Sequence, residues 1–298
     1  MPLMTRILAV LAAVLLIGSP ASADPGDGLS QSLDPSQSVA TGPAVLEAGH
    51  ADIGPRYRDG AWSVQIHDDA TSPAVWRHPE EAIFRVRDTA RQQIPADDAY
   101  AFLGEAPGSE VYVVPQTQQD DVVWIGWNTQ DPGVMSAIDR GVTMTLRGVQ
   151  GPGSLTVYLQ SGNLGAPQVL WASAKPQAQS IWAETNTHTH ANWVFSKPGA
   201  YLVAVDVTAD LADGGTIAAS TILRFAIGDT TDPAAARAAT YAGDLLPGTT
   251  PAAAPATTEA TTGSLVVAGG AAVAVLALVV LLVARGAAAR RRAERDRS

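Results

Sequence analysis

The 298-residue sequence contains no cysteine. This absence excludes disulfide bonds, thiol nucleophiles, zinc–thiolate centres and iron–sulfur clusters. Any metal ion must therefore be held by histidine, aspartate, glutamate or asparagine. The fold must also be stable through packing alone, which an ordered module of about 190 residues can provide.

Amphipathic helices are scarce as well, because the apolar residues recur with a period of two rather than 3.6. The one weak helical candidate is the segment 87–93, which Pro95 soon stops. Alternating strands are predicted at 62–66, 155–159, 201–207 and 223–227, separated by turns rich in glycine and proline. The sequence therefore predicts an all-β architecture, most simply a β-sandwich.

Positive charge is sparse before the C-terminal tail. Residues 24–284 contain 12 basic and 27 acidic residues, a net charge of −15, whereas six arginines follow residue 284. Such a surface argues against nucleic acid as a partner and suits cations or proteins with basic faces. An acidic surface is also common simply because it keeps a protein soluble. Charge alone therefore does not decide between a role in binding cations or basic proteins and a role in solubility.

Two apolar segments predict export and anchoring. Residues 1–23 combine Arg6, an apolar run and a small-residue cleavage site, which is the pattern of a signal peptide. Residues 264–284 carry no charge and, at about 1.5 Å per residue, can cross a bilayer as a helix. The basic tail 285–298 should remain cytoplasmic by the positive-inside rule. We expect an exported, single-pass membrane protein with an extracellular N-terminal module near the cell wall.

Composition divides the remainder of the chain. The predicted parts are a flexible leader at 24–43, an N-terminal β lobe at 44–139, an immunoglobulin-like β-sandwich at 140–228 and an Ala/Thr/Pro-rich stalk at 229–263. The segment 246–250 is similar to a sortase signal, but it lies well before the hydrophobic segment. Retention by the predicted membrane helix is therefore the simpler expectation.

Two pairs of polar residues have the spacing of one strand face. His188 and His190 are two positions apart, so their side chains should point the same way, with Cα atoms roughly 6 to 7 Å apart. His50 and Asp52 repeat this spacing near the start of the module. Together they offer three nitrogens and one oxygen, a donor set that suits zinc. A shared site requires the three imidazoles to approach within roughly 5 Å of one another.

Other polar and aromatic residues near these pairs have alternative roles. His67 is a reserve ligand, His78 in an expected loop is less suited, and Asn192 could orient a ligand. Trp193 and Phe195 should lie on the strand face opposite the paired histidines, which would then point toward solvent or a cleft. The tryptophans at 124, 127, 182 and 193 are assigned to the core in preference to a ligand groove.

Several segments together resemble a known family. The segments 49–52, 100–104, 113–118, 124–129, 151–153 and 188–201, in this order, are similar to the actinobacterial surface-anchored domain described as choice-of-anchor M. The resemblance spans nearly the whole module. It implies an anchored, exported protein commonly encoded beside a metal-type ABC transporter with its own solute-binding protein, and suspected to help acquire zinc or manganese. It implies no established catalytic activity and places the family's histidine segments at His50, His188 and His190.

Three classes of function follow. The first is a cell-surface accessory that binds zinc or manganese through His188, His190, His50 and Asp52 and works with an ABC-type metal uptake system. The second is a non-catalytic adhesion or interaction module without metal, which binds a wall polymer or a protein. The third is a metallohydrolase with Glu184 as base, but the sequence contains no recognised catalytic motif. We expect that the protein is not an enzyme.

Overall fold

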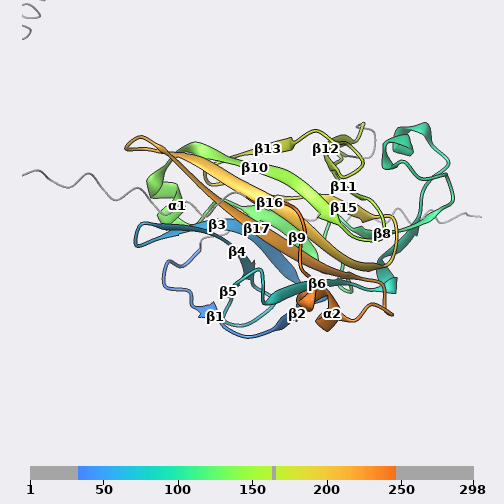
Figure 1. Ribbon diagram of the computed structural model, residues 1–298, viewed down its shortest axis with the longest axis horizontal. Coiled ribbons are helices and arrows are strands. Elements are labelled where there is room, and N and C mark those ends of the chain that lie inside the picture. Colours follow the sequence, from blue (N-terminus) through green and yellow to red (C-terminus); the bar gives the residue numbers. More distant parts are fainter. Residues whose placement is uncertain (1–32, 163–165, 246–298) are drawn as a thin grey trace, which may run out of the picture. The chain divides into compact units, whose positions relative to one another are not determined.

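Strands form wherever the apolar residues alternate, and they dominate the computed structural model of this protein (Figure 1). The structure describes residues 33–162 and 166–245, all of which lie in one compact unit. Each of the four predicted strands falls within an observed strand, so the all-β prediction is confirmed. The predicted signal peptide, membrane helix and basic tail lie outside the described residues. No helix within 33–162 and 166–245 is long and apolar enough to span a bilayer.

The strands are arranged in three sheets, and the order of strands below is their order in space. The first sheet contains β1 (Val39–Ala40), β5 (Val75–Arg77), β4 (Ala61–Asp68), β3 (His50–Arg58), β9 (Trp124–Asn128) and β14 (His188–His190). The second contains β13 (Gln179–Glu184), β10 (Ile138–Gln150), β16 (Gly199–Leu211), β17 (Thr216–Ile227), β6 (Ala82–Val86) and β2 (Ala44–Leu46). The third contains β12 (Gln168–Ala172), β11 (Leu155–Leu159), β15 (Asn192–Phe195), β8 (Glu110–Val114) and β7 (Arg91–Gln93).

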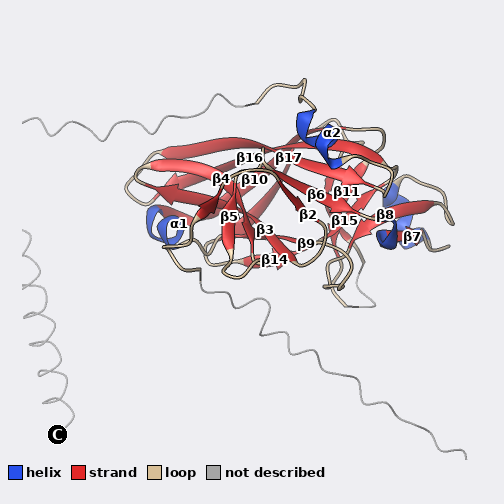
Figure 2. Cartoon of the chain, turned by 90° about the horizontal axis from the view of Figure 1, so that it is seen from below, coloured by secondary structure: helices blue, strands red, loops and turns tan. Residues whose placement is uncertain are grey.

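The second sheet forms one layer of a sandwich, and both other sheets pack on it (Figure 2). From the first sheet, the Trp62 indole donates to the carbonyl of Val207, at 3.1 Å. From the third sheet, the ring of Phe195 lies 4.9 Å from that of Phe225. The chain passes from the first sheet to the third at the buried Ala191, between β14 and β15. The interior between the layers is filled by aliphatic and aromatic side chains, as expected for a fold without disulfides.

The expected boundary between residues 139 and 140 does not separate two lobes. Strand β14 completes the first sheet, while β2 and β6 extend the second sheet beyond β17. Every sheet therefore combines strands from both predicted ranges, and 140–228 is not a separate immunoglobulin-like sandwich. The reason is long-range pairing, such as the parallel pairing of β6 with β17, which composition and periodicity do not reveal.

The folded part is also longer than expected at both ends. Within the predicted flexible leader, β1 pairs with β5 and Leu33 is buried. Within the predicted stalk, α2 (Pro233–Ala238) begins after Asp232, whose side chain accepts from the amide of Ala234. Its Ala236 is buried against Ile83 and Ala226 on the outer side of the second sheet. The predicted flexible leader and stalk therefore include folded residues at 33–43 and 229–242, which are held by contacts with distant strands.

The remaining helices are short. The weak helical candidate at 87–93 contains a single 3₁₀ turn, η1 (Asp88–Ala90), followed by the strand β7. A second 3₁₀ segment is η2 (Asp98–Leu103), and α1 (Pro132–Ala137) follows β9. Asp131 caps α1 through the amide of Val134 and also accepts two bonds from the Arg58 guanidinium, at 2.7 and 2.6 Å. This carboxylate therefore ties the helix to the end of β3.

The tryptophans divide into core and surface positions. Trp193 is fully buried and Trp127 is 4% exposed, as the core assignment requires. Trp124 is only partly buried, and Trp182 is 53% exposed on β13. The core assignment was therefore right for Trp193 and Trp127 and wrong for Trp182.

Trp193 and Trp182 give a matched test of this packing. Trp193→Ala should destabilise the protein by about 3–5 kcal/mol, because it removes a fully buried ring. Trp182→Ala should change the free energy of unfolding by only about 0.5 kcal/mol, because its ring is largely solvated. Urea unfolding followed by circular dichroism measures both. Equal losses in the two variants would contradict this assignment of core and surface.

Candidate metal centre

The order of three strands brings the two polar pairs together. Strand β9 lies between β3, with which it is parallel, and β14, with which it is antiparallel. In this register Gly126 is opposite Asp52 on one side and His190 on the other. Residues opposite each other share a face of the sheet, so the side chains of β3 and β14 meet above β9. His50 and His188, 138 residues apart in sequence, come into direct contact.

Gly126 leaves the space in which these side chains meet. A Cβ atom at this position would lie 2.5 Å from Asp52 Oδ1 and 2.8 Å from His190 Cε1. Both distances are far below van der Waals contact, so a side chain here would displace the carboxylate and the imidazole. The absence of a side chain on the middle strand is therefore a requirement of the cluster.

The donor atoms form a compact group. The Nε2 atoms of His50, His188 and His190 are each 3.0 Å from the other two. Asp52 Oδ1 lies 3.2 Å from His50 Nε2 and 3.7 Å from His190 Nε2, and Asp52 Oδ2 lies 2.9 Å from His188 Nε2. The geometric condition set by the sequence is thus met. Four donors around a tetrahedral zinc ion, at about 2.0 to 2.1 Å from it, are separated by about 3.3 Å. The four residues could hold a metal ion.

Hydrogen bonds among the three imidazoles alone do not satisfy this arrangement. Each Nε2 has a single in-plane position, which carries either one hydrogen or one lone pair. Three such atoms at 3.0 Å from one another cannot all be paired among themselves, so the group also relies on the carboxylate of Asp52, which lies 2.9 Å from His188 Nε2. Moreover, the buried Oδ1 of Asp52 has no partner with full hydrogen-bond geometry among the described residues. A single cation at the centre would accept all three lone pairs and neutralise the carboxylate.

Three further residues hold the ligand side chains in place. Asp69 accepts from His50 Nδ1 at 2.7 Å, which directs Nε2 of that ring to the cluster. The Asn128 amide donates to Asp52 Oδ2 at 3.3 Å. The Trp124 ring stacks on His190 with centroids 3.5 Å apart and an angle of 10° between the planes. Partners of this kind fix the orientation and tautomer of metal-binding histidines.

The paired histidines do not face solvent. The side chains of His188 and His190 are 0% and 2% exposed, and that of Asp52 is fully buried. The expectation that Trp193 and Phe195 point into the core is confirmed. The further inference, that the paired histidines would then point toward solvent or a cleft, was incomplete. The strand changes sheets at Ala191, and Trp124 covers the imidazoles on their own side.

Burial and charge act in different directions on the members of the cluster. Burial would lower the pKa of His50, but the carboxylates of Asp52 and Asp69 outweigh it and raise this pKa to about 9. Burial lowers the pKa of His190 to about 3, so this ring is neutral at physiological pH. Burial would raise the pKa of Asp52, yet the imidazoles of His188 and His50 hold it below its ordinary value. The cluster therefore contains an ionised carboxylate in a buried position.

The other sequence candidates lie outside the cluster. His67 is buried against Trp76, and its Nε2 lies 3.1 Å from Gln37 Oε1. His78 lies in a loop with its side chain 43% exposed. Asn192 accepts from the amide of Gln116, which follows β8, and is not part of the cluster. Asn128 instead takes the orienting role that was expected of Asn192.

Sequence reasoning missed the roles of Gly126, Asn128 and Asp69, and it assigned Trp124 to the core although its ring stacks on His190. Trp124, Gly126 and Asn128 alternate along β9, so they share one face. That alternation was a usable signal only once β9 was known to lie between β3 and β14.

Comparisons with known proteins do not identify the chain. No family model, curated protein or solved structure matches it. The class that the fold and site define is an all-β protein with a buried cluster of three histidines and one aspartate. The resemblance to the choice-of-anchor M family stays a prediction.

Gly126→Ala tests the space above β9. The added methyl group should displace Asp52 and His190 and lower zinc affinity by at least about tenfold. Gly141→Ala is the matched control, because a Cβ atom at Gly141 on β10 would also be crowded, 2.4 Å from the carbonyl oxygen of Ala183, but this residue lies outside the cluster. It should cost stability and leave zinc affinity unchanged. Isothermal titration measures both affinities, and an equal effect of the two variants would refute the role of Gly126.

The raised pKa of His50 predicts a pH dependence. Below its pKa of about 9 His50 is protonated and cannot ligate, so zinc binding near neutral pH must release about one proton. Zinc affinity should therefore rise by about tenfold per pH unit as the pH increases toward this pKa. Titrations in buffers of different ionisation enthalpy count the protons released. Asp69→Asn should reduce that count, and a heat that is independent of buffer would contradict the assignment.

Proposed function

We propose that this protein is a cell-surface, membrane-anchored accessory protein that binds zinc and supports an ABC-type metal uptake system. The observation that carries the proposal is the convergence of three Nε2 atoms, 3.0 Å from one another, beside the carboxylate of Asp52. The metal ion would be held by His50, Asp52, His188 and His190. These residues come from both ends of the folded part, so the ion would join β3 to β14.

The donor set favours zinc over manganese. Imidazole nitrogen suits zinc, whereas carboxylate, carbonyl and water oxygens suit manganese, and the cluster contains only one carboxylate. Its small size also fits four-coordinate tetrahedral binding better than an octahedral site. Manganese should therefore bind more weakly than zinc.

The completeness of the donor set favours binding over catalysis. A catalytic zinc ion usually has three protein ligands and an open position for water. In this cluster four protein groups, whose ligand atoms lie within 4.8 Å of one another, could supply all four positions of a tetrahedron, and their side chains are 11% exposed or less. Glu184, considered as a catalytic base, belongs to β13 and is not part of the cluster.

The surroundings support a role in capturing metal outside the cell. The excess of acidic residues between 24 and 284 attracts cations at long range. The signal peptide and membrane helix predicted from the sequence would expose the module to the extracellular medium. The family resemblance adds the uptake system and its solute-binding protein as partners, which receive the metal in this proposal.

The proposal is tested by zinc titration of the full-length protein in detergent. One zinc ion should bind per chain, and His190→Ala should weaken binding by about 100-fold or more, since it removes a ligand. His78→Ala is the matched control, because His78 lies outside the cluster and should leave binding unchanged. Manganese is titrated in parallel and should bind less tightly.

A negative result has a clear meaning. Absence of heat, together with no competition against a zinc chelator, would remove the metal-binding function. The remaining function would then be the adhesion or interaction module without metal.

A further inference from the structure

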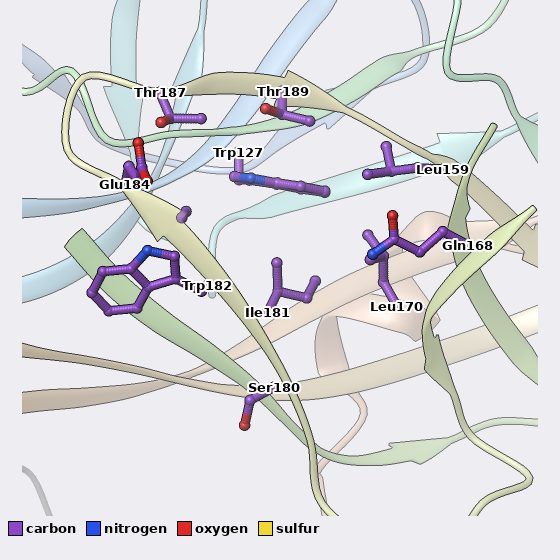
Figure 3. A pocket seen from close by; sticks show the side chains of 11 residues that line it. Trp127, Leu159, Gln168, Leu170, Ser180, Ile181, Trp182, Glu184, Thr187 and Thr189 are labelled. Carbon is purple, nitrogen blue, oxygen red and sulfur yellow. The ribbon is translucent and has the colours of Figure 1, made fainter. Parts of the chain in front are cut away.

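A groove lies where the edge strands of all three sheets meet, and at one end the Gln179 side chain of β13 hydrogen-bonds to the backbone of Ala172 on β12. Strand β14 ends the first sheet, β13 ends the second, and β12 ends the third. Residues of these strands line a cavity of about 520 Å³ together with Trp127 and Leu159 (Figure 3). Its volume lies within the range of about 300–1,000 Å³ that is typical of ligand sites. Thr189 on β14 and the preceding Thr187 line the groove, whereas His188 and His190 point to the opposite face.

The groove follows the edge of β13. Residues 180–184 all line it, although consecutive side chains on a strand point to opposite faces. A groove can be lined by a continuous stretch of strand only if it runs along the strand edge. Among the described residues, β13 pairs with β10 alone. Its second edge is therefore the one that faces the groove.

Backbone groups on this edge are directed into the groove. The amide of Thr185 donates to the carbonyl of Arg140 on β10, at 2.8 Å. In an antiparallel pair, residues at alternate positions face the partner, so Ser180 and Trp182 direct their backbone amides and carbonyls away from β10. The carbonyl of Glu184, which points the same way, already accepts from the Thr129 hydroxyl at 2.6 Å. The edge thus offers the hydrogen-bonding pattern of an unfilled strand position.

Side chains around this edge define what could occupy it. Trp182 is 53% exposed, an unusual amount for so large an apolar residue, and Trp127 lines the groove from the first sheet. Glu184 is the only charged residue among those that line the groove. The walls therefore suit an apolar side chain against the indoles and a basic side chain near the carboxylate.

We propose that the groove binds an extended segment of another polypeptide, which adds a strand beside β13. Backbone hydrogen bonds to Ser180 and Trp182 would supply affinity, and alternate side chains would contact the two indoles and Glu184. The chain's own segment 249–262 is a poor occupant, because Pro251 and Pro255 lack the amide hydrogens that a strand donates. This proposal does not depend on metal binding, for which the proposed site lies on the other face of β14.

Substitutions at Ser180 distinguish binding through the backbone of the strand edge from binding through the side chain. Ser180→Pro removes the amide that faces the groove and retains pairing with β10, because proline is tolerated on the outer side of an edge strand. Ser180→Ala is the matched control, since it removes only the hydroxyl, which contacts Thr145. Circular dichroism and zinc titration of both variants report whether the fold is intact.

The probe is a phage-displayed library of random ten-residue peptides, selected on the full-length protein in detergent. We expect peptides with alternating apolar residues and a basic residue, whose affinity falls at least tenfold in Ser180→Pro and less than twofold in Ser180→Ala. Methylation of alternate backbone amides in a selected peptide should also abolish its binding.

Three outcomes would overturn the proposal. The first is the failure to select any peptide that is sensitive to Ser180→Pro in a folded variant. The second is binding of N-acetylglucosamine oligomers that depends on Trp182 without any peptide binding, which would make the groove a glycan site. The third is a dimer in analytical ultracentrifugation that Ser180→Pro dissociates, which would make the occupant a second copy of the chain.

Discussion

The buried carboxylate of Asp52, surrounded by three imidazoles, is the constraint on which this structure depends. A fully buried ionised group costs several kcal/mol unless an opposite charge compensates it. In this protein the compensation comes from the proton of His50, and a divalent ion in the proposed site would also supply it. Both require β3, β9 and β14 to keep their register. A shift of one residue in any of these strands would turn its polar side chains to the other face of the sheet. The same requirement explains why glycine stands in the middle strand, where a Cβ atom would collide with the carboxylate.

The short strand β14 belongs to both sites of the molecule. Its histidines point into the cluster, while Thr189 and the preceding Thr187 line the groove on the other side. Immediately after it, Ala191 carries the chain into the third sheet, where Trp193 and Phe195 enter the main core. A single short segment therefore contains ligands of the proposed metal, residues that line the groove and residues that pack in the core. The two proposed functions are compatible, because they use opposite faces of one strand.

Parts of the fold and site were predictable because they depend on local spacing. Alternation gave the strands, and the two-residue spacing of His188 and His190, and of His50 and Asp52, gave the donor pairs. The division into two lobes failed because β2, β6 and β14 pair with strands far away in sequence. The ends of the folded part were misjudged because β1 and α2 depend on contacts with distant strands rather than on their own composition. Asp69 and Gly126 escaped notice for the same reason, since their roles depend on neighbours from other strands.

The sequence by itself determined the chemistry that is available and the local direction of the side chains. Without cysteine, imidazole and carboxylate groups are the ligands of choice for zinc, and alternation places each pair on one face of a strand. The tertiary structure alone decided that β9 lies between β3 and β14, so that the two pairs converge above Gly126. It also decided that three sheet edges meet along β13. Strand order is set by the total burial of apolar surface across the sandwich, a property of the whole chain that no local pattern contains.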